Sequence, residues 1–188
     1  MRVIAGTLKG RRLLSPRWAG LRPTSDRLRE TLFDILATRV EGTRVLDGCA
    51  GTGAIGIEAL SRGAEHVVFV ERDTRAVALI RRNVALCGLT ERCTIVRAVM
   101  PASVRCASVG PFDLVLLDPP YGAPNIGAIL TAAAGQLGPR GLLVLERARR
   151  DTPVTAKALD SIRVVRVGES LLELYAPAVG DCLDDETE

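Results

Sequence analysis

The sequence lacks any apolar run that approaches the roughly 20 residues a membrane-spanning helix needs. Its first residues also lack the charged-then-apolar pattern of a secretory signal peptide. Its five cysteines are scattered without a C-x-x-C pair, which argues against a zinc site and against a disulfide framework. We therefore expect a cytoplasmic protein that has no membrane partner and no bound metal.

Aromatic residues are also scarce, at 3% of the 188 residues, although hydrophobic residues make up 47%. A core built from so few rings must be aliphatic, and short runs of valine, leucine, isoleucine and alanine favour a buried parallel sheet covered by helices. The length suits one domain with a small appendage.

Acidic residues are wholly absent from residues 1–25, although the net charge of the chain is only +3. Short apolar pairs around a glycine-rich centre predict a basic β-hairpin arm there, with Arg11 and Arg12 projecting from it. We favour contact with nucleic acid over a hairpin that simply packs on the domain. Arg27 and Arg29 follow on a predicted helix over 26–38, either as ordinary surface charges or as part of this basic face. The acidic residues of 178–188 predict a disordered tail.

Strand and helix patterns alternate from residue 44 onward, which predicts right-handed crossovers and a doubly wound, mostly parallel α/β sheet. The last two strands read as an antiparallel hairpin at the sheet edge. The expected domain runs over residues 26–177. Its seven predicted strands cover residues 44–47, 66–71, 93–97, 112–118, 141–146, 163–167 and 170–176, and its later helices cover 53–61, 73–86 and 126–136.

A glycine-rich turn follows the first of these strands and matches G-x-G-x-x-G at Gly51, Gly53 and Gly56. Glu71 ends the next strand, where an acidic residue can bind ribose hydroxyls. A nicotinamide dinucleotide is one interpretation of this pattern. However, Asp47 places a carboxylate beside the turn, which would repel a pyrophosphate but suits a ligand with a cationic amino-acid group. We therefore prefer S-adenosylmethionine as the cofactor.

The stretch Asp118-Pro119-Pro120-Tyr121 follows a buried strand over residues 112–117 and shares its sheet edge with Asp47 and Glu71. A nucleobase amine is a weak nucleophile, because its lone pair is delocalised into the ring. The carboxylate of Asp118 and a backbone carbonyl at Pro119 can each accept one N–H while Tyr121 stacks on the base. These four residues are the predicted catalytic group.

Several motifs together resemble one enzyme family. Residues 118–121 resemble motif IV of the amino-directed class I S-adenosylmethionine methyltransferases, and residues 47–53 resemble their motif I. The N-terminal blocks at 3–6, 9–11 and 22–30 resemble those of the RsmD family, whose members methylate the N2 amine of a guanine in 16S ribosomal RNA. The resemblance covers residues 2–176 and implies a Rossmann-like class I methyltransferase fold.

Carried over by position, the resemblance implies a cofactor site and a base site. The residues expected to hold S-adenosylmethionine are Asp47, Gly51, Gly53 and Glu71, and those expected to hold the guanine are Asp118, Pro119, Pro120 and Tyr121. The implied partner is 16S rRNA on an assembled or assembling small subunit, bound by a monomer through Arg11, Arg12, Arg22, Arg27 and their neighbours. One departure is residues 97–99, where many relatives carry an acid that contacts the adenine; backbone and apolar contacts are expected to take its place.

Three alternatives remain open from the residues alone. The same tetrapeptide serves adenine-N6, cytosine-N4 and protein-glutamine methyltransferases. The glycine turn also fits an NAD-dependent oxidoreductase. A catalytically silent RNA-binding protein is the third, although intact acids at positions 47, 71 and 118 argue against it.

Overall fold

The computed structural model describes residues 1–16, 18, 21, 24–101 and 110–178. Two features predicted from the sequence, Arg22 and the acidic tail from residue 179 onward, lie outside the described residues.

In the described part of the chain, seven strands form one sheet in the order β3-β2-β1-β4-β5-β7-β6. The strands are β1 (Arg44–Asp47), β2 (His66–Glu71), β3 (Cys93–Arg97), β4 (Phe112–Leu117), β5 (Leu137–Ala148), β6 (Leu159–Val167) and β7 (Ser170–Pro177). The first five pair in parallel, and β7 pairs antiparallel with both β5 and β6. The predicted mostly parallel sheet with a C-terminal antiparallel hairpin is confirmed.

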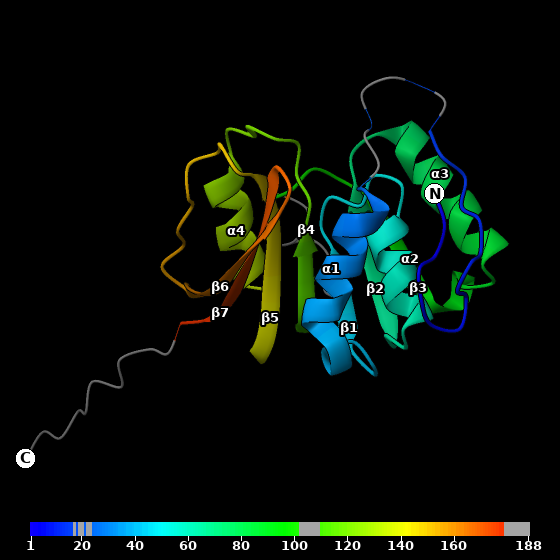
Figure 1. Cartoon of the computed structure of the whole chain (residues 1–188), viewed down its shortest axis with the longest axis horizontal. Helices are drawn as coiled ribbons and strands as arrows, with labels where there is room; N and C mark the ends of the chain where they lie inside the picture. Colours follow the sequence, from blue (N-terminus) through cyan, green and yellow to red (C-terminus); the bar gives the residue numbers. More distant parts are fainter. Residues whose placement is uncertain (17, 19–20, 22–23, 102–109, 179–188) are drawn as a thin grey trace, which may run out of the picture.

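Helices cover both faces of this sheet (Figure 1). They are α1 (Asp26–Leu36), α2 (Ala54–Ser61), α3 (Thr74–Leu86) and α4 (Ile126–Ala134), with short 3₁₀ turns at Ala37–Arg39 and Thr90–Arg92. One aliphatic core joins α1, α2 and α3 to one face of the sheet, and a second core joins α4 to the other. Because strand side chains alternate between faces, neighbouring residues Val45 and Leu46 belong to different cores. None of the described helices is long and apolar enough to cross a membrane.

Two strands begin earlier than the sequence indicated. Strand β5 begins at Leu137 rather than at residue 141, and β6 begins at Leu159 rather than at residue 163. The segment before residue 141 contains glycine and proline, which usually mark a loop. Here Leu137 pairs with Phe112 of β4 before a register shift, so the pairing starts ahead of the regular strand.

Residues 1–14 form the predicted hairpin, and it is packed on the domain. Arg2 and Arg12 form an antiparallel bridge, and the Val3 amide donates to the Arg11 carbonyl at 2.9 Å. Val3 and Leu13 are buried in the same core as α1 and α2. Figure 1 shows this segment running alongside α3.

The carboxylate of Glu58, on α2, binds the backbone of this hairpin. Its two oxygens accept hydrogen bonds from the Ile4 and Ala5 amides at 2.7 and 2.9 Å. Arg29 of α1 lies 3.6 Å from the same carboxylate and donates to the Arg2 carbonyl at 2.8 Å. Both interpretations of Arg29 from the sequence are therefore wrong, because its side chain is fully buried and joins the hairpin to two helices.

Candidate active site

A cavity of about 700 Å³ opens at the carboxyl ends of β1, β2 and β4. Strand β1 lies between β2 and β4, so the chain changes direction across the sheet at this point, where ligands of open α/β sheets bind. The cavity wall includes Gly51 and Glu71 together with all of Asp118, Pro119, Pro120 and Tyr121. The volume falls within the roughly 300–1,000 Å³ typical of small-molecule sites.

The glycine turn brings the backbone close to this cavity. Gly51 and Gly53 have φ angles of 53° and 76°, a left-handed conformation that L side chains rarely adopt. Gly53 is the N-cap of α2 and faces Ile80 of α3, so it shapes the turn and does not line the cavity. A Cβ at Gly56 would lie 2.3 Å from the Phe69 ring, so this third glycine allows α2 to pack on β2.

Glu71 closes the same turn from the end of β2. Its Oε2 accepts a hydrogen bond from the Gly51 amide at 2.8 Å. Its Oε1 accepts from the Arg72 and Asp73 amides at 2.7 and 2.8 Å. Three backbone donors thus orient a partly exposed carboxylate on the cavity wall, in a position where it can accept hydroxyl groups from a ligand.

Asp47 lies behind the glycine turn and is 1% exposed. Its Oδ2 accepts a hydrogen bond from the Gly56 amide at 3.1 Å, and it is not among the cavity-lining residues. Burial raises the pKa of Asp47 to about 7, the Gly56 hydrogen bond opposes this shift, and the Glu71 charge adds to it. Because the glycine turn separates Asp47 from the cavity, Asp47 can influence a ligand only through its charge and not by direct contact.

We expect the Asp47→Asn variant to be more stable than the wild type above pH 7. The native carboxyl holds its proton up to about pH 7, whereas the unfolded carboxyl loses it near pH 3.9. Native stability should therefore fall as the pH rises from about 4 to about 7 and then level off. At about 1.4 kcal/mol per pKa unit, the asparagine variant gains up to about 4 kcal/mol at pH 8.

Urea unfolding of both proteins at pH 5 and pH 8 measures this difference. The exposed Asp34→Asn change is the matched control and should leave the pH dependence unchanged. If the free energies of unfolding of the wild type and of Asp47→Asn fall by the same amount between pH 5 and pH 8, the buried Asp47 carboxyl does not cause the pH dependence.

The tetrapeptide 118–121 follows β4 directly, and Asp118 is half-buried in the cavity wall. The Thr24 hydroxyl donates a hydrogen bond to Asp118 Oδ2. Burial and the neighbouring Glu146 carboxyl raise the pKa of Asp118 well above its usual range, and the Thr24 hydrogen bond lowers it. The N-terminal segment thus reaches the predicted catalytic carboxylate and orients one of its oxygens.

Tyr121 is 40% exposed, and its hydroxyl is held at one side of the cavity. It donates to Glu146 Oε1 at 2.9 Å and lies 2.8 Å from Ser170 Oγ. The ring is therefore fixed through its hydroxyl group and remains partly exposed in the cavity wall.

Sequence reasoning missed Thr24, Glu146 and Ser170 as site residues. Thr24 directly precedes Ser25, which is the N-cap of α1 and accepts from the Leu28 amide at 3.2 Å. Glu146 ends the strand predicted over 141–146, so the strand-end rule that selected the other acids also applied to it. No local pattern distinguishes Ser170.

The remaining cavity wall is mostly apolar near the end of β3, where Ala98, Val99 and Met100 line it. Cys49 also lines the cavity, but burial raises the pKa of its thiol to about 12, with smaller contributions from nearby acids. Its thiol is therefore neutral and not a nucleophile at neutral pH. Among the described residues, no group of three or more histidines, cysteines and acids is placed to hold a metal ion.

Trp18, which precedes α1 in the chain, lies beside the start of α3. Its ring packs 5.2 Å from the guanidinium carbon of Arg75, which is held by Asp73 at the start of α3. Both Trp18 and Arg75 line the cavity.

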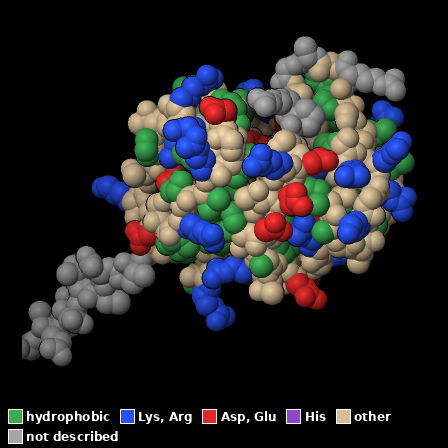
Figure 2. All heavy atoms as spheres, in the orientation of Figure 1, with side chains coloured by type: hydrophobic (Ala, Val, Ile, Leu, Met, Phe, Trp, Pro, Cys, Tyr) green, Lys and Arg blue, Asp and Glu red, His purple; other side chains and the backbone are tan. Residues whose placement is uncertain are grey.

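Arg11 and Arg12 are exposed, as predicted, but lie away from the cavity. Burial raises the pKa of Cys87, at the end of α3, and the nearby Arg11 charge lowers it. The cavity meets the opposite end of α3, and a helix of 13 residues is about 20 Å long. Figure 2 shows basic side chains on the side of the molecule where the hairpin and α3 lie, with acidic side chains between them.

Comparison with known proteins identifies relatives over most of the chain. A family model described as conserved hypothetical protein 95 matches residues 1–176. The protein named ribosomal RNA small subunit methyltransferase D of Haemophilus influenzae is 37% identical over 123 residues, which are 64% of this chain and 64% of that protein. The protein of the same name in Escherichia coli K12 is 37% identical over 121 residues, which are 64% of this chain and 60% of that protein.

The matches to these two methyltransferases thus span less than two thirds of their length. A solved structure, that of a hypothetical protein of Thermus thermophilus, superposes with a TM-score of 0.77 at 31% identity. That superposition covers 95% of this chain and 99% of the other.

Proposed function

Because the chain belongs to the family described as conserved hypothetical protein 95, we propose that it is an S-adenosylmethionine-dependent methyltransferase of ribosomal RNA. Its acceptor is the N2 amine of a guanine in 16S rRNA, on the assembled or assembling small subunit. The observation that carries the proposal is the placement of Asp118 and Tyr121 on the same cavity as the glycine turn and Glu71. A base and a cofactor can meet there.

The residues present fit the cofactor. Glu71 would accept the ribose hydroxyls, the backbone around Gly51 would lie against the ligand, and the apolar residues from Ala98 to Met100 would contact the adenine; all of these residues line the cavity. When bound, S-adenosylmethionine supplies a methyl group on a positively charged sulfur. The buried Asp47 carboxylate lies behind the turn and favours that positive charge when it is ionised.

On the acceptor side, the chain positions a weak nucleophile. Asp118 accepts one hydrogen of the target amine, and the Pro119 carbonyl accepts the other, so the nitrogen lone pair is directed at the methyl carbon. Tyr121, held by Glu146, stacks on the base. These contacts act by position and charge rather than by a covalent intermediate. A base within folded RNA must turn out of its stack to reach them.

Mass-spectrometric mapping of methylated nucleosides tests the proposed reaction. Small subunits from cells that lack this protein are incubated with the purified chain and isotopically labelled S-adenosylmethionine. The expected result is one labelled N2-methylguanosine in 16S rRNA. Label in adenosine, cytidine or protein glutamine would overturn the proposed acceptor, and absence of label in every small-subunit component would overturn the proposed function.

The basic hairpin is proposed to bind RNA that flanks the target. Changing both Arg11 and Arg12 to alanine should weaken binding to small-subunit RNA and reduce the slope of log K against log salt by about 2, because two phosphate contacts are lost. Titrations at several salt concentrations measure this slope.

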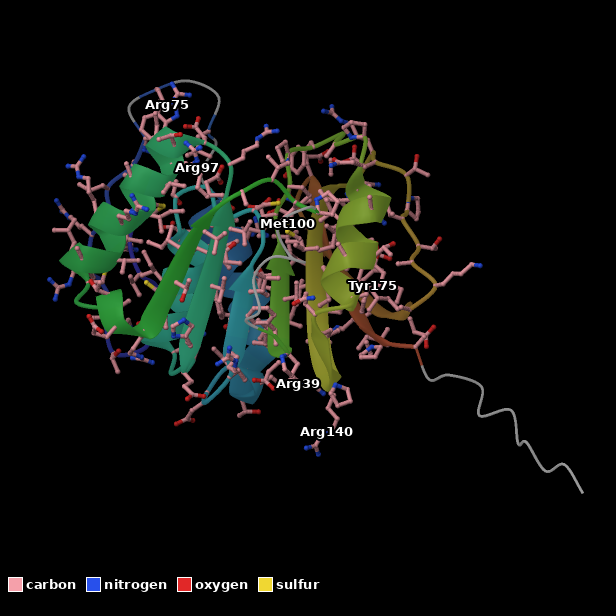
Figure 3. All side chains as sticks on the ribbon, turned by 180° about the vertical axis from the view of Figure 1, so that it is seen from behind. Arg39, Arg75, Arg97, Met100, Arg140 and Tyr175 are labelled. Atoms are coloured by element: carbon pink, nitrogen blue, oxygen red, sulfur yellow. The ribbon has the colours of Figure 1, made fainter. Side chains whose placement is uncertain are left out.

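The matched control changes two exposed arginines that are not part of the hairpin, Arg39 and Arg140. Both lie away from the edge of the sheet where Arg75 and Arg97 lie (Figure 3). The Arg39→Ala, Arg140→Ala double variant should keep the wild-type slope. An unchanged slope in the Arg11, Arg12 variant would make the hairpin a purely structural element.

A further inference from the structure

Glu146 has a carboxyl oxygen for which the described residues provide no donor. The side chain is 6% exposed and lies on β5, in the wall of the same cavity as Asp118. Its Oε1 accepts the Tyr121 hydroxyl at 2.9 Å. Its Oε2 is buried and receives no hydrogen bond from a described N–H or hydroxyl group.

A buried carboxyl oxygen without a donor is costly, and native structures contain few of them. One that lies in a cavity wall is open to a ligand that brings a donor. The neighbouring acid is Asp118, which has its own donor in Thr24. Asp118 also lies within hydrogen-bond reach of Glu146, and this contact helps to raise the pKa of Asp118, so the two carboxyl groups share a proton when no base is bound. A base that brings two donors would let both groups ionise, and Glu146 is the one with a buried oxygen that no described N–H or hydroxyl group reaches.

The three nucleobase amines differ at the ring nitrogen beside them. In guanine, N1 beside the N2 amine carries a hydrogen, so the edge presents two neighbouring donors. In adenine and in cytosine, the ring nitrogen beside the amine is an acceptor. Two adjacent ionised carboxyl groups match the guanine edge better than the other two, because a carboxylate beside an acceptor nitrogen is repelled and leaves both groups unpaired.

We propose that Glu146 selects guanine at this site by accepting the N1–H of the base while Asp118 accepts a hydrogen of the N2 amine. The inference rests on the proposed function and deepens it, since it says why the acceptor is guanine rather than adenine or cytosine. Glu146 is then a specificity-determining residue that touches the substrate.

A purely structural role for Glu146 would be to hold Tyr121. The Tyr121 hydroxyl, however, also lies 2.8 Å from Ser170 Oγ, so the ring keeps a polar partner when Glu146 is changed. Loss of Tyr121 positioning would lower the rate for every base equally. Loss of the N1–H acceptor would change the preference between bases, and this difference separates the two roles.

The test uses synthetic RNA that spans the mapped target. One version carries guanine, and a second carries 2,6-diaminopurine, which keeps the N2 amine but has an acceptor at N1. A third carries 6-thioguanine, which keeps the N1–H and changes only the O6 position. For the full-length wild type we expect kcat/KM on diaminopurine to fall by about 100-fold relative to guanine. On 6-thioguanine it should stay within about 10-fold of guanine, since the N1–H is retained.

The Glu146→Gln variant places an amide where the carboxylate was. It should lose about 10- to 100-fold in kcat/KM on guanine, and its preference for guanine over diaminopurine should shrink by a similar factor, since an amide N–H can donate to the acceptor at N1. Affinity for S-adenosylmethionine, measured by calorimetry, should equal that of the wild type. The exposed Glu169→Gln change is the matched control and should keep both rates and their ratio.

Two outcomes overturn the inference while the proposed function stands. One is a wild type that methylates guanine and diaminopurine equally well, which needs no variant to fold. The other is a Glu146→Gln variant that slows both substrates by the same factor. A wild type that forms no N2-methylguanosine in any small-subunit RNA overturns the proposed function itself, and the inference with it.

Discussion

Replacing Asp118 with alanine should lower methyl transfer by about 10²- to 10³-fold and leave the affinity for S-adenosylmethionine unchanged. Asp118 directly follows the last residue of β4 and lines the cavity, and the Thr24 hydroxyl orients one of its oxygens. Without the carboxylate, the target amine loses an acceptor, and its lone pair stays delocalised into the ring. Single-turnover assays on small subunits measure the transfer step, and calorimetry measures cofactor affinity.

Asp113→Ala is the matched control, because Asp113 lies on the same strand but is exposed and accepts a hydrogen bond from the Arg44 amide at 2.9 Å, far from the cavity. This control should transfer methyl groups at the wild-type rate. Wild-type turnover by Asp118→Ala would remove Asp118 from the mechanism.

The second large effect concerns stability: Glu58→Ala should lower the free energy of unfolding by about 3–5 kcal/mol. The Glu58 side chain is fully buried and also accepts from Arg62 Nε at 2.8 Å. Its removal leaves the fully buried Arg29 with Asp26 as its remaining carboxylate partner, at 2.7 Å, and leaves the Ile4 and Ala5 amides without their acceptor. Denaturant unfolding followed by circular dichroism measures the loss.

Two further variants separate the effect of the charge from that of the acceptor oxygen and provide a control. Glu58→Gln keeps the acceptor oxygen but not the charge, so it should fall between the wild type and Glu58→Ala. The exposed Glu65→Ala change should shift the unfolding midpoint very little. Equal midpoints for Glu58→Ala and Glu65→Ala would mean that the buried network contributes nothing to stability.

The fold was predictable because the pattern of each element is local. The alternation of short apolar runs with helical patterns located β1, β2 and β3 to the residue. The early starts of β5 and β6 were not predictable, because they depend on pairing with β4 and β7 rather than on their own residues.

The sequence predicted which edge of the sheet carries the site, but it did not predict the direction in which each side chain points. Parallel strands place Asp47, Glu71 and Asp118 at one edge, and the structure places Glu71 and Asp118 in the cavity. Asp47 shares the face of Val45 rather than that of Leu46, so it points toward α2 and bonds to Gly56. That direction depends on the exact end of the strand and on the position of a helix.

Contacts between distant segments were the other unpredictable part. The sequence indicated an exposed position for Arg29, because only Asp26 is a local partner and the partners that bury the side chain come from residues 2 and 58. Thr24 was not predicted as a site residue, because its partner Asp118 lies 94 positions later in the chain. Neither pair leaves a local spacing pattern that could be read in advance.

The site gathers Thr24, Asp118, Glu146 and Ser170, and this has a consequence for protein synthesis. The translating ribosome delivers Thr24 early and Ser170 near the end of the described chain, so the base-binding side stays incomplete until β7 has emerged and paired. A nascent or prematurely terminated chain that stops before β7 can form the glycine turn, but its β5 lacks the antiparallel partner and Tyr121 lacks the Ser170 contact. Methyl transfer thereby becomes an indicator of completed synthesis, and partial translation products should be inert.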